Sequence, residues 1–190
     1  MVQSMMKKRL KTGALLAIAM IAGSAVVDAE DAGGKLLQDF EPSNGTDGGT
    51  CFQQIWNCTG DFEMTQVHNG AQSLKLETAQ NGGTAGIRVM STKGIADLSK
   101  AKKITLWVYD TQGENTIELR IKDAGGNGGT GPDGKTLWSA NKSKKNVWTK
   151  IEWDLQSYPA AQGLDLTQVS MLEVYEFNAG VYYIDDVEYE

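Results

Sequence analysis

The sequence VYYIDDVEYE, residues 181–190, combines β-forming side chains with two adjacent carboxylates. Side chains of an extended strand alternate between two faces, so Val181, Tyr183, Asp185, Val187 and Tyr189 are expected on one face. That face is apolar except for Asp185. A carboxylate among apolar neighbours loses its hydration, which is costly unless a partner compensates. The sequence therefore predicts that Asp185 has a partner: a basic side chain, a cluster of backbone N–H groups or a metal ion.

Runs with the same alternation occur along most of the chain, separated by Gly, Asn and Asp. Together they amount to about ten short strands, and long amphipathic helical patterns are absent from the sequence. This pattern predicts an all-β sandwich or barrel. The clearest runs are SLKLET (73–78), KKITLWVYD (102–110), NTIELRIKD (115–123), VWTKIEWDL (147–155) and VSMLEVYEF (169–177).

The N-terminus has the pattern of a secretory signal peptide. Four basic residues between positions 7 and 11 precede an apolar run at 13–22 that is short for a membrane span. We expect cleavage after Ala29, with Ala25 as the competing position and an uncleaved anchor as the alternative. Residues 30–190 would then form one secreted, extracellular or cell-surface domain, and the 41% hydrophobic content of the whole chain is enough for an ordinary core.

Charge and cysteine content restrict the partners. Removal of residues 1–29 takes away four basic residues and one acidic residue, so the formal net charge changes from −6 to −9. Such an acidic domain is a poor ligand for nucleic acid or for an anionic membrane surface. Export makes a disulfide between Cys51 and Cys58 reasonable, and this bond would close a small loop around Trp56.

Several strands carry aromatic and charged side chains on the face opposite to their apolar residues. Flat rings stack on the C–H face of a pyranose, while carboxylate, amide and guanidinium groups bond its hydroxyls, so this composition favours sugar recognition. For Trp107 the alternative is packing, and for Glu118 and Arg120 it is an ordinary cross-strand ion pair. For Trp56 and Trp138 the alternative is that the ring only anchors a loop. The candidate ligand contacts are Trp56, Arg88, Trp107, Tyr109, Glu118, Arg120, Trp138, Glu173 and Tyr175. Trp148 and Trp153 are expected in the core.

An ordered set of motifs covers residues 36–190: LLQDFE (36–41), HNGAQSLKLE (68–77), GIADLSKAKKITLWVYD (94–110), NTIELRIKDAGG (115–126), VWTKIEWDLQSY (147–158) and VYYIDDVEY (181–189). This set resembles the bacterial carbohydrate-binding modules that have a calcium-containing β-jelly roll of the galactose-binding-like type. The resemblance implies a β-sandwich jelly roll of two antiparallel sheets. It also implies noncatalytic binding of plant cell-wall or related polysaccharides, by a monomer or a module appended to a glycoside hydrolase.

The same resemblance implies a structural Ca²⁺ between the first strand, the turn before SLKL and the last strand. Asp185 matches the terminal metal-binding Asp, and Asp39 or Glu41 matches the acidic group of the first strand. Backbone oxygens near Asn69, Gly70 and Gln72 would complete the shell, because Ca²⁺ prefers six to eight oxygen ligands. The alternative remains that Asp185 pairs with a basic side chain or with backbone N–H groups.

Two other functions compete with sugar binding. One is a jelly-roll glycoside hydrolase or polysaccharide lyase, for which Glu118, Glu152 and Glu173 are outward carboxylates, although no motif selects a pair and we assign no catalytic residue. The other is an adhesive cell-surface domain that uses the fold for protein contacts.

Overall fold

The computed structural model describes residues 34–42, 51–79, 82–89, 94–128, 137–157, 163–176 and 178–190. The predicted signal peptide at residues 1–29 and the start of the predicted domain at residue 30 lie outside the described residues. Among those described, no helix is both long and apolar enough to span a membrane.

Eleven strands and two short 3-10 helices make up the regular structure of the described residues. Their bounds follow the alternating runs of the sequence, and Gly, Asn and Asp occupy many of the intervening turns. The strands are β1 (Lys35–Gln38), β2 (Phe52–Trp56), β3 (Cys58–Glu63), β4 (Ser73–Thr78), β5 (Gly83–Arg88), β6 (Lys103–Asp110), β7 (Glu118–Asp123), β8 (Leu137–Trp138), β9 (Trp148–Asp154), β10 (Val169–Glu176) and β11 (Gly180–Tyr189), and the 3-10 helices are η2 (Leu155–Ser157) and η3 (Leu166–Gln168).

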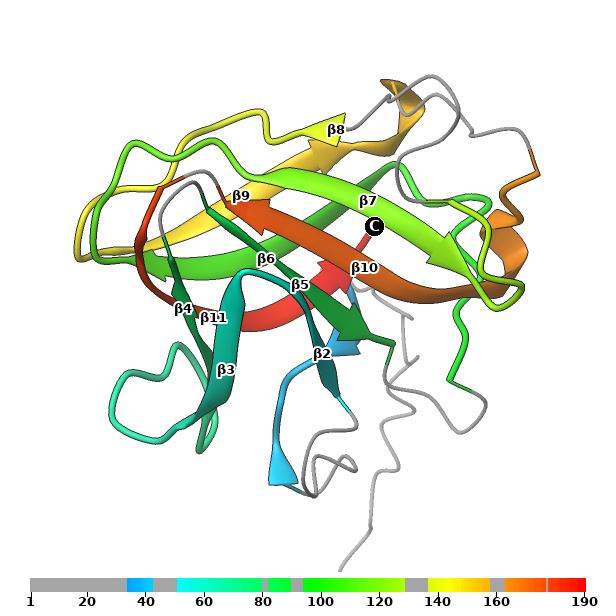
Figure 1. Ribbon diagram of the computed structural model, residues 1–190. Helices are drawn as coiled ribbons and strands as arrows, with labels where there is room; N and C mark the ends of the chain where they lie inside the picture. The colour runs from blue at the N-terminus through cyan, green and yellow to red at the C-terminus, as the bar shows by residue number, and fades with distance from the viewer. Residues whose placement is uncertain are drawn as a thin grey trace, which may run out of the picture. The chain divides into compact units, whose positions relative to one another are not determined.

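The strands form two antiparallel sheets that face each other (Figure 1). One sheet has six strands, in the order β3-β4-β11-β6-β9, with β1 also paired to β11. The other has five strands, in the order β2-β5-β10-β7-β8, and β5, β10 and β7 form the front layer in Figure 1. This arrangement confirms the predicted all-β sandwich of two antiparallel sheets.

The core lies between the sheets and is filled by alternate residues of the strands. Trp153 is fully buried as predicted, and its indole N–H donates to the Ile117 carbonyl at 3.0 Å. Trp148 differs from the prediction, because it is half-buried on the outward face of β9. The inward residues of the central strands agree with the sequence pattern: Ile104, Leu106 and Val108 of β6, Leu119 and Ile121 of β7, and Leu172 and Val174 of β10.

The last strand departs from the simple alternation expected for residues 181–190. Tyr182 and Ile184 point into the core, but after them the inward position passes to Val187. The cause is a β-bulge: the pairing with β6 shifts between Asp185 and Glu188, and Asp186 has a left-handed φ of 43°. The prediction that Asp185 and Val187 share one face is therefore wrong.

The predicted Cys51–Cys58 disulfide is not formed, and both residues are thiols. The sequence between them is not a closed loop but contains the five-residue strand β2. A strand of this length spans roughly 16 Å, whereas a disulfide requires Cα atoms within about 7 Å. The neighbours agree, because the Cys51 carbonyl accepts from Arg88 N–H while the Cys58 thiol donates to the Thr84 carbonyl, four residues earlier on β5.

We expect alkylation by iodoacetamide under denaturing conditions to modify both cysteines without prior reduction. In the native protein Cys51 should be protected, because burial raises the pKa of its thiol to about 11 and leaves little thiolate at neutral pH. Intact-mass measurement of native, unfolded and reduced samples checks this. Alkylation of the unfolded protein only after reduction would show that a disulfide exists.

Candidate functional site

The outer face of the five-stranded sheet brings together residues from all five strands in one row. On this face Tyr175 of β10 is paired with Thr84 of β5 on one side and with Glu118 of β7 on the other. Thr84 is paired with Trp56 of β2, and Glu118 with Trp138 of β8. These five residues are called the cross-sheet row below.

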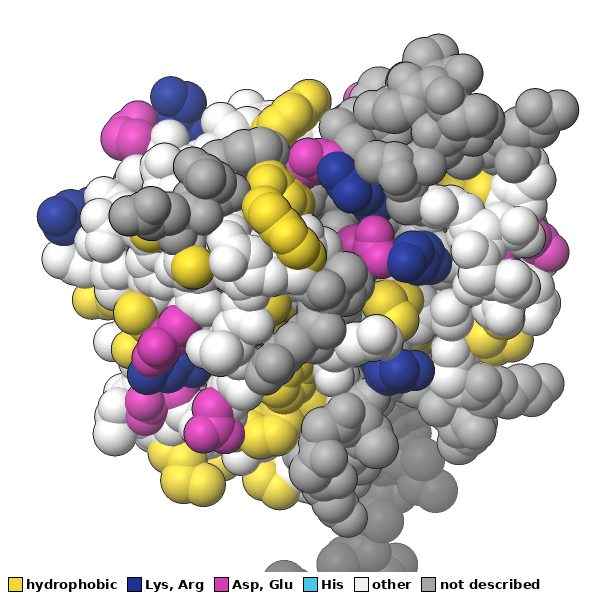
Figure 2. All heavy atoms as spheres, viewed as in Figure 1, with side chains coloured by type: hydrophobic (Ala, Val, Ile, Leu, Met, Phe, Trp, Pro, Cys, Tyr) yellow, Lys and Arg dark blue, Asp and Glu magenta, His cyan; other side chains and the backbone are white. Residues whose placement is uncertain are grey.

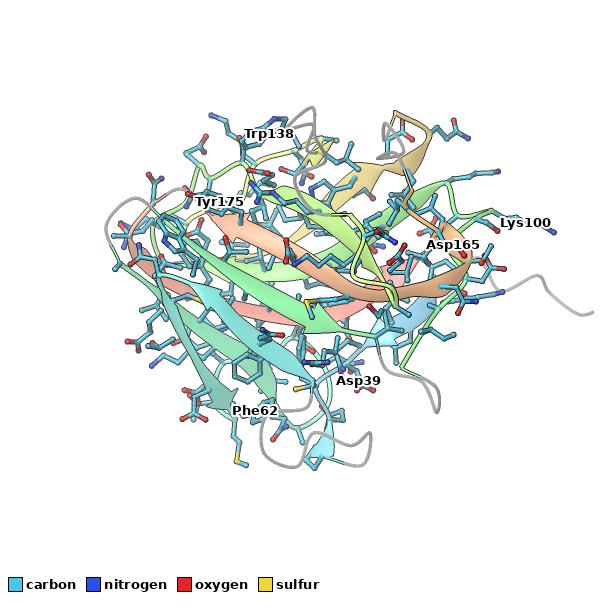
Figure 3. All side chains as sticks on the ribbon, turned by 45° about the vertical axis from the view of Figure 1, so that its right-hand side comes forward. Asp39, Phe62, Lys100, Trp138, Asp165 and Tyr175 are labelled. Atoms are coloured by element: carbon cyan, nitrogen blue, oxygen red, sulfur yellow. The ribbon has the colours of Figure 1, made fainter. Side chains whose placement is uncertain are left out.

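Aromatic rings occupy three of the five positions in the cross-sheet row. Trp56 and Trp138, at the two edge strands, are each 49% exposed. The Trp56 and Tyr175 rings are parallel within 7°, with centroids 5.7 Å apart, and Tyr175 and Trp138 both lie on this face (Figure 3). Partly exposed, mutually ordered rings of this kind present flat apolar surface without a large entropic cost on ligand binding.

Charged side chains lie beside the rings and are fixed by one another. The Arg120 guanidinium donates to Glu118 Oε1 at 2.6 Å and lies 5.8 Å from the centre of the Tyr175 ring. Lys122 makes an ion pair with Glu173, the cross-strand neighbour of Arg120. Figure 2, which views this sheet from outside, shows acidic and basic side chains adjacent to one another and next to hydrophobic ones.

These ion pairs determine what the face offers chemically. Glu118 and Glu173 are each only 4% exposed, so their positions are well defined. Arg88, exposed at the end of β5, contacts the amide of Gln53 at 3.3 Å. Carboxylate, guanidinium and amide groups provide both acceptors and donors for hydroxyl groups. Seven of the nine predicted ligand contacts are therefore on this face: Trp56, Arg88, Glu118, Arg120, Trp138, Glu173 and Tyr175.

Trp107 and Tyr109, the other two predicted contacts, lie on the outer face of the opposite sheet. Both are half-buried residues of β6. His68 stacks on Trp107 with ring centroids 4.0 Å apart, and Tyr109 has edge contacts with Trp148 and Tyr183. The core separates this aromatic cluster from the cross-sheet row, so one bound chain cannot contact both.

Asp185 is fully buried, and its carboxylate accepts hydrogen bonds from backbone N–H groups. Oδ2 accepts from His68 at 3.0 Å and from Asn69 at 3.2 Å, and Oδ1 accepts from Asp186 at 2.9 Å. Burial is the main cause that raises the pKa of Asp185 to about 6, opposed by the Asn69 hydrogen bond. Next to it, Asp186 Oδ2 lies 2.7 Å from His68 Nδ1. The sequence indicated a partner for Asp185 but gave no signal for the roles of His68 and Asp186.

The other predicted calcium ligands, Asp39, Glu41 and Gln72, lie where the first strand meets the turn before β4. Asp39 Oδ1 accepts from the Glu41 N–H at 3.1 Å, and Gln72 Nε2 donates to the Phe40 carbonyl at 2.5 Å. Within the described residues, no three His, Cys, Asp or Glu side chains are arranged to hold one metal ion. The contacts fit the N–H alternative for Asp185 rather than an oxygen-lined calcium site, and calcium binding stays a prediction.

Comparisons with known proteins concern the fold. No protein-family model and no curated protein matches the chain. Among solved structures, the family 11 carbohydrate-binding module of a cellulosomal cellulase from Clostridium thermocellum superposes with a TM-score of 0.54 and 13% identity, covering 83% of this chain and 94% of that one. The CBM22-1 xylan-binding domain of Xyn10C from Paenibacillus barcinonensis gives 0.51 and 15%, covering 83% and 94%. A complex of the family 11 module from Clostridium thermocellum with a β-1,3-1,4-mixed-linked tetrasaccharide gives 0.51 and 13%, covering 82% and 94%. The chain has the β-sandwich fold of these carbohydrate-binding modules.

We expect the substitution Arg120→Ala to destabilise the domain by about 1–3 kcal/mol, because it leaves the buried Glu118 carboxylate without its guanidinium partner. The double substitution Glu118→Gln with Arg120→Ala should restore part of this loss, because no buried charge remains unpaired. Urea unfolding followed by tryptophan fluorescence measures both. Equal destabilisation by the single and double substitutions would contradict the role assigned to this ion pair.

Proposed function

We propose that this protein binds polysaccharide without catalysis, on the outer face of the five-stranded sheet. The observation that carries the proposal is the cross-sheet row, in which Trp56, Tyr175 and Trp138 place aromatic rings on three different strands of one face. Ion-paired carboxylate and basic groups lie immediately beside the rings. The fold shared with carbohydrate-binding modules supports the same reading.

The row sets the direction of the ligand on the sheet. Neighbouring strands are about 4.8 Å apart, so the four intervals from β2 to β8 extend over about 19 Å. A glycan chain that follows the row runs across the strands. Trp56 and Trp138 then contact the outer rings, and Tyr175 contacts a central one.

The aromatic rings and the charged side chains of this face have different roles in sugar recognition. Stacking of apolar sugar faces on the rings supplies the favourable burial. Arg120 and Lys122, held in place by the buried Glu118 and Glu173, orient the hydroxyls. An open face with few directed hydrogen bonds suits affinities on the order of micromolar to millimolar Kd for oligosaccharides. We take β-1,4-linked cell-wall glycans such as xylan, glucomannan or mixed-linkage glucan as the ligand class to test first.

The same contacts bear on the alternative of a hydrolase. Glycoside hydrolysis requires two carboxyl groups that act on opposite sides of one glycosidic bond. On this face Glu118 is engaged by Arg120, and Glu173 is engaged by Lys122. Glu152, the third outward carboxylate, lies on β9 of the other sheet. We therefore propose a secreted binding protein, a monomer or a module appended to a glycoside hydrolase, and not an enzyme.

Calorimetric titration with soluble xylan, glucomannan and mixed-linkage glucan tests the proposal. We expect at least one to bind, and Tyr175→Ala to weaken that binding about tenfold or more, because it removes the central ring. Tyr183→Ala is the matched control, since Tyr183 is an outward aromatic residue of β11 on the opposite sheet.

Absence of binding to all three glycans and to pectin would contradict the proposal. If Tyr183→Ala weakened glycan binding more than Tyr175→Ala, the binding site would lie on the six-stranded sheet and not on the proposed face. Release of reducing ends from any of these polysaccharides would favour the hydrolase, and capture of a cell-surface protein by a sugar-inert domain would favour the adhesive alternative.

A further inference from the structure

One turn between β3 and β4, residues 68–72, directs four backbone N–H groups toward two carboxylates. His68 and Asn69 donate to Asp185 Oδ2 at 3.0 and 3.2 Å. Ala71 and Gln72 donate to Glu41 Oε1 at 2.8 and 3.3 Å. Residues 68–72 are called the carboxylate-binding turn below.

The two carboxylates come from residues near opposite ends of the domain's sequence. Glu41 follows the first strand, β1, and Asp185 belongs to the last strand, β11, which is paired with β1. The Gln72 side chain adds a hydrogen bond to the carbonyl of Phe40, a fully buried residue beside Glu41. The carboxylate-binding turn therefore joins the first strand, the last strand and the start of β4.

The middle of the turn is shaped to accept the Glu41 carboxylate. Gly70 has a φ of 73°, and a Cβ atom at this position would lie 2.1 Å from Glu41 Oε1. Only glycine leaves room for the carboxylate here and adopts this left-handed conformation without strain. A side chain at residue 70 would displace Glu41 from the N–H groups of Ala71 and Gln72.

This geometry differs from what a calcium ion requires. Ca²⁺ binds six to eight oxygen atoms at 2.3–2.6 Å. In the carboxylate-binding turn, N–H groups face Asp185 and Glu41, and the positive end of each N–H dipole would repel a cation placed among them. Three N–H groups already donate to the two oxygens of Asp185.

We propose that the carboxylate-binding turn is a metal-free closure of the sandwich. Protein N–H groups here bind the two carboxylates at the place where the sequence resemblance implies a structural Ca²⁺. The domain then folds, and holds the outer face of the five-stranded sheet, without a divalent cation. This inference does not depend on the proposed sugar binding.

A cavity of about 240 Å³ beside the turn is an alternative place where a cation could bind. Four acidic residues line it, Asp39, Glu41, Asp186 and Glu188, together with Asn69 and Gly70 of the turn. A cation in this cavity would meet Asp186 and Glu188 as well as Glu41, whereas the site that the resemblance implies is centred on Asp185. Glu188→Gln removes one of these charges without touching the described hydrogen bonds of the turn, so it is the matched control for Asp185→Asn.

The test is thermal unfolding of the protein in excess EDTA and in millimolar CaCl2 at the same pH, with the metal content of the dialysed protein measured by mass spectrometry. We expect the same Tm in both solutions and no stoichiometric calcium. Asp185→Asn should lower the Tm equally in both, because an amide in place of the carboxylate cannot accept all three N–H bonds. If Asp185→Asn does not fold, the wild-type comparison still decides the question.

A rise in Tm that continues with the logarithm of the CaCl2 concentration would overturn the proposal, because a ligand that binds only the folded state stabilises it by mass action. The variants then locate the ion. Loss of the rise in Asp185→Asn alone would place calcium at the predicted site, whereas loss in Glu188→Gln alone would place it in the acidic cavity.

Discussion

The alternation of side chains along paired strands is the constraint on which the rest of this structure depends. Two antiparallel sheets share one core, so every second residue of a central strand must be apolar and point inward, and its neighbours must point outward. Antiparallel pairing then aligns the outward residues of β2, β5, β10, β7 and β8 in rows across the sheet. Trp56, Tyr175 and Trp138 come from distant parts of the chain and share a surface for this reason. A shift of one residue in the pairing of β10 would turn Tyr175 into the core and Val174 outward, which would destroy the core and the aromatic face together.

The last strand interrupts this alternation at one place, and the interruption connects the ends of the domain. The bulge at Asp185 and Asp186 turns one carboxylate toward the backbone N–H groups of the carboxylate-binding turn and the other toward the His68 ring. His68 in turn stacks on Trp107 of β6. Trp107 and Trp148 on the outside of the six-stranded sheet therefore cover this junction, whereas Trp56 and Trp138 of the cross-sheet row remain half exposed at the sheet edges. Similar side chains thus have different roles on the two sheets.

Much of this arrangement follows from the sequence, and the limits have physical causes. Local alternation identifies the inward residues of β6, β7 and β10 because burial on one face is a property of each strand by itself. Assignment of Trp107 and Tyr175 to different sheets depends on long-range pairing, which no local pattern contains.

The bulge depends on a left-handed φ at Asp186, a residue type that adopts such a conformation only in some contexts. Cysteine spacing alone predicts a short loop closed by a disulfide, whereas the residues between Cys51 and Cys58 contain an extended strand that separates the two cysteines. A buried carboxylate requires a partner, and backbone N–H groups are one of the three kinds that the sequence allows for Asp185. Only the three-dimensional position of residues 68–72 decides between them.

The indole N–H signals of the five tryptophans provide the most direct test of the central claim, that the cross-sheet row is the ligand face. They lie in three environments: Trp56 and Trp138 in the row, Trp107 and Trp148 on the opposite sheet, and Trp153 in the core. In a ¹⁵N-resolved NMR titration with a soluble β-glucan or xylan oligosaccharide, the signals of Trp56 and Trp138 should shift progressively with ligand. Those of Trp107, Trp148 and Trp153 should remain in place. Shifts confined to Trp107 and Trp148 would show that the sugar binds the other sheet and would contradict the account.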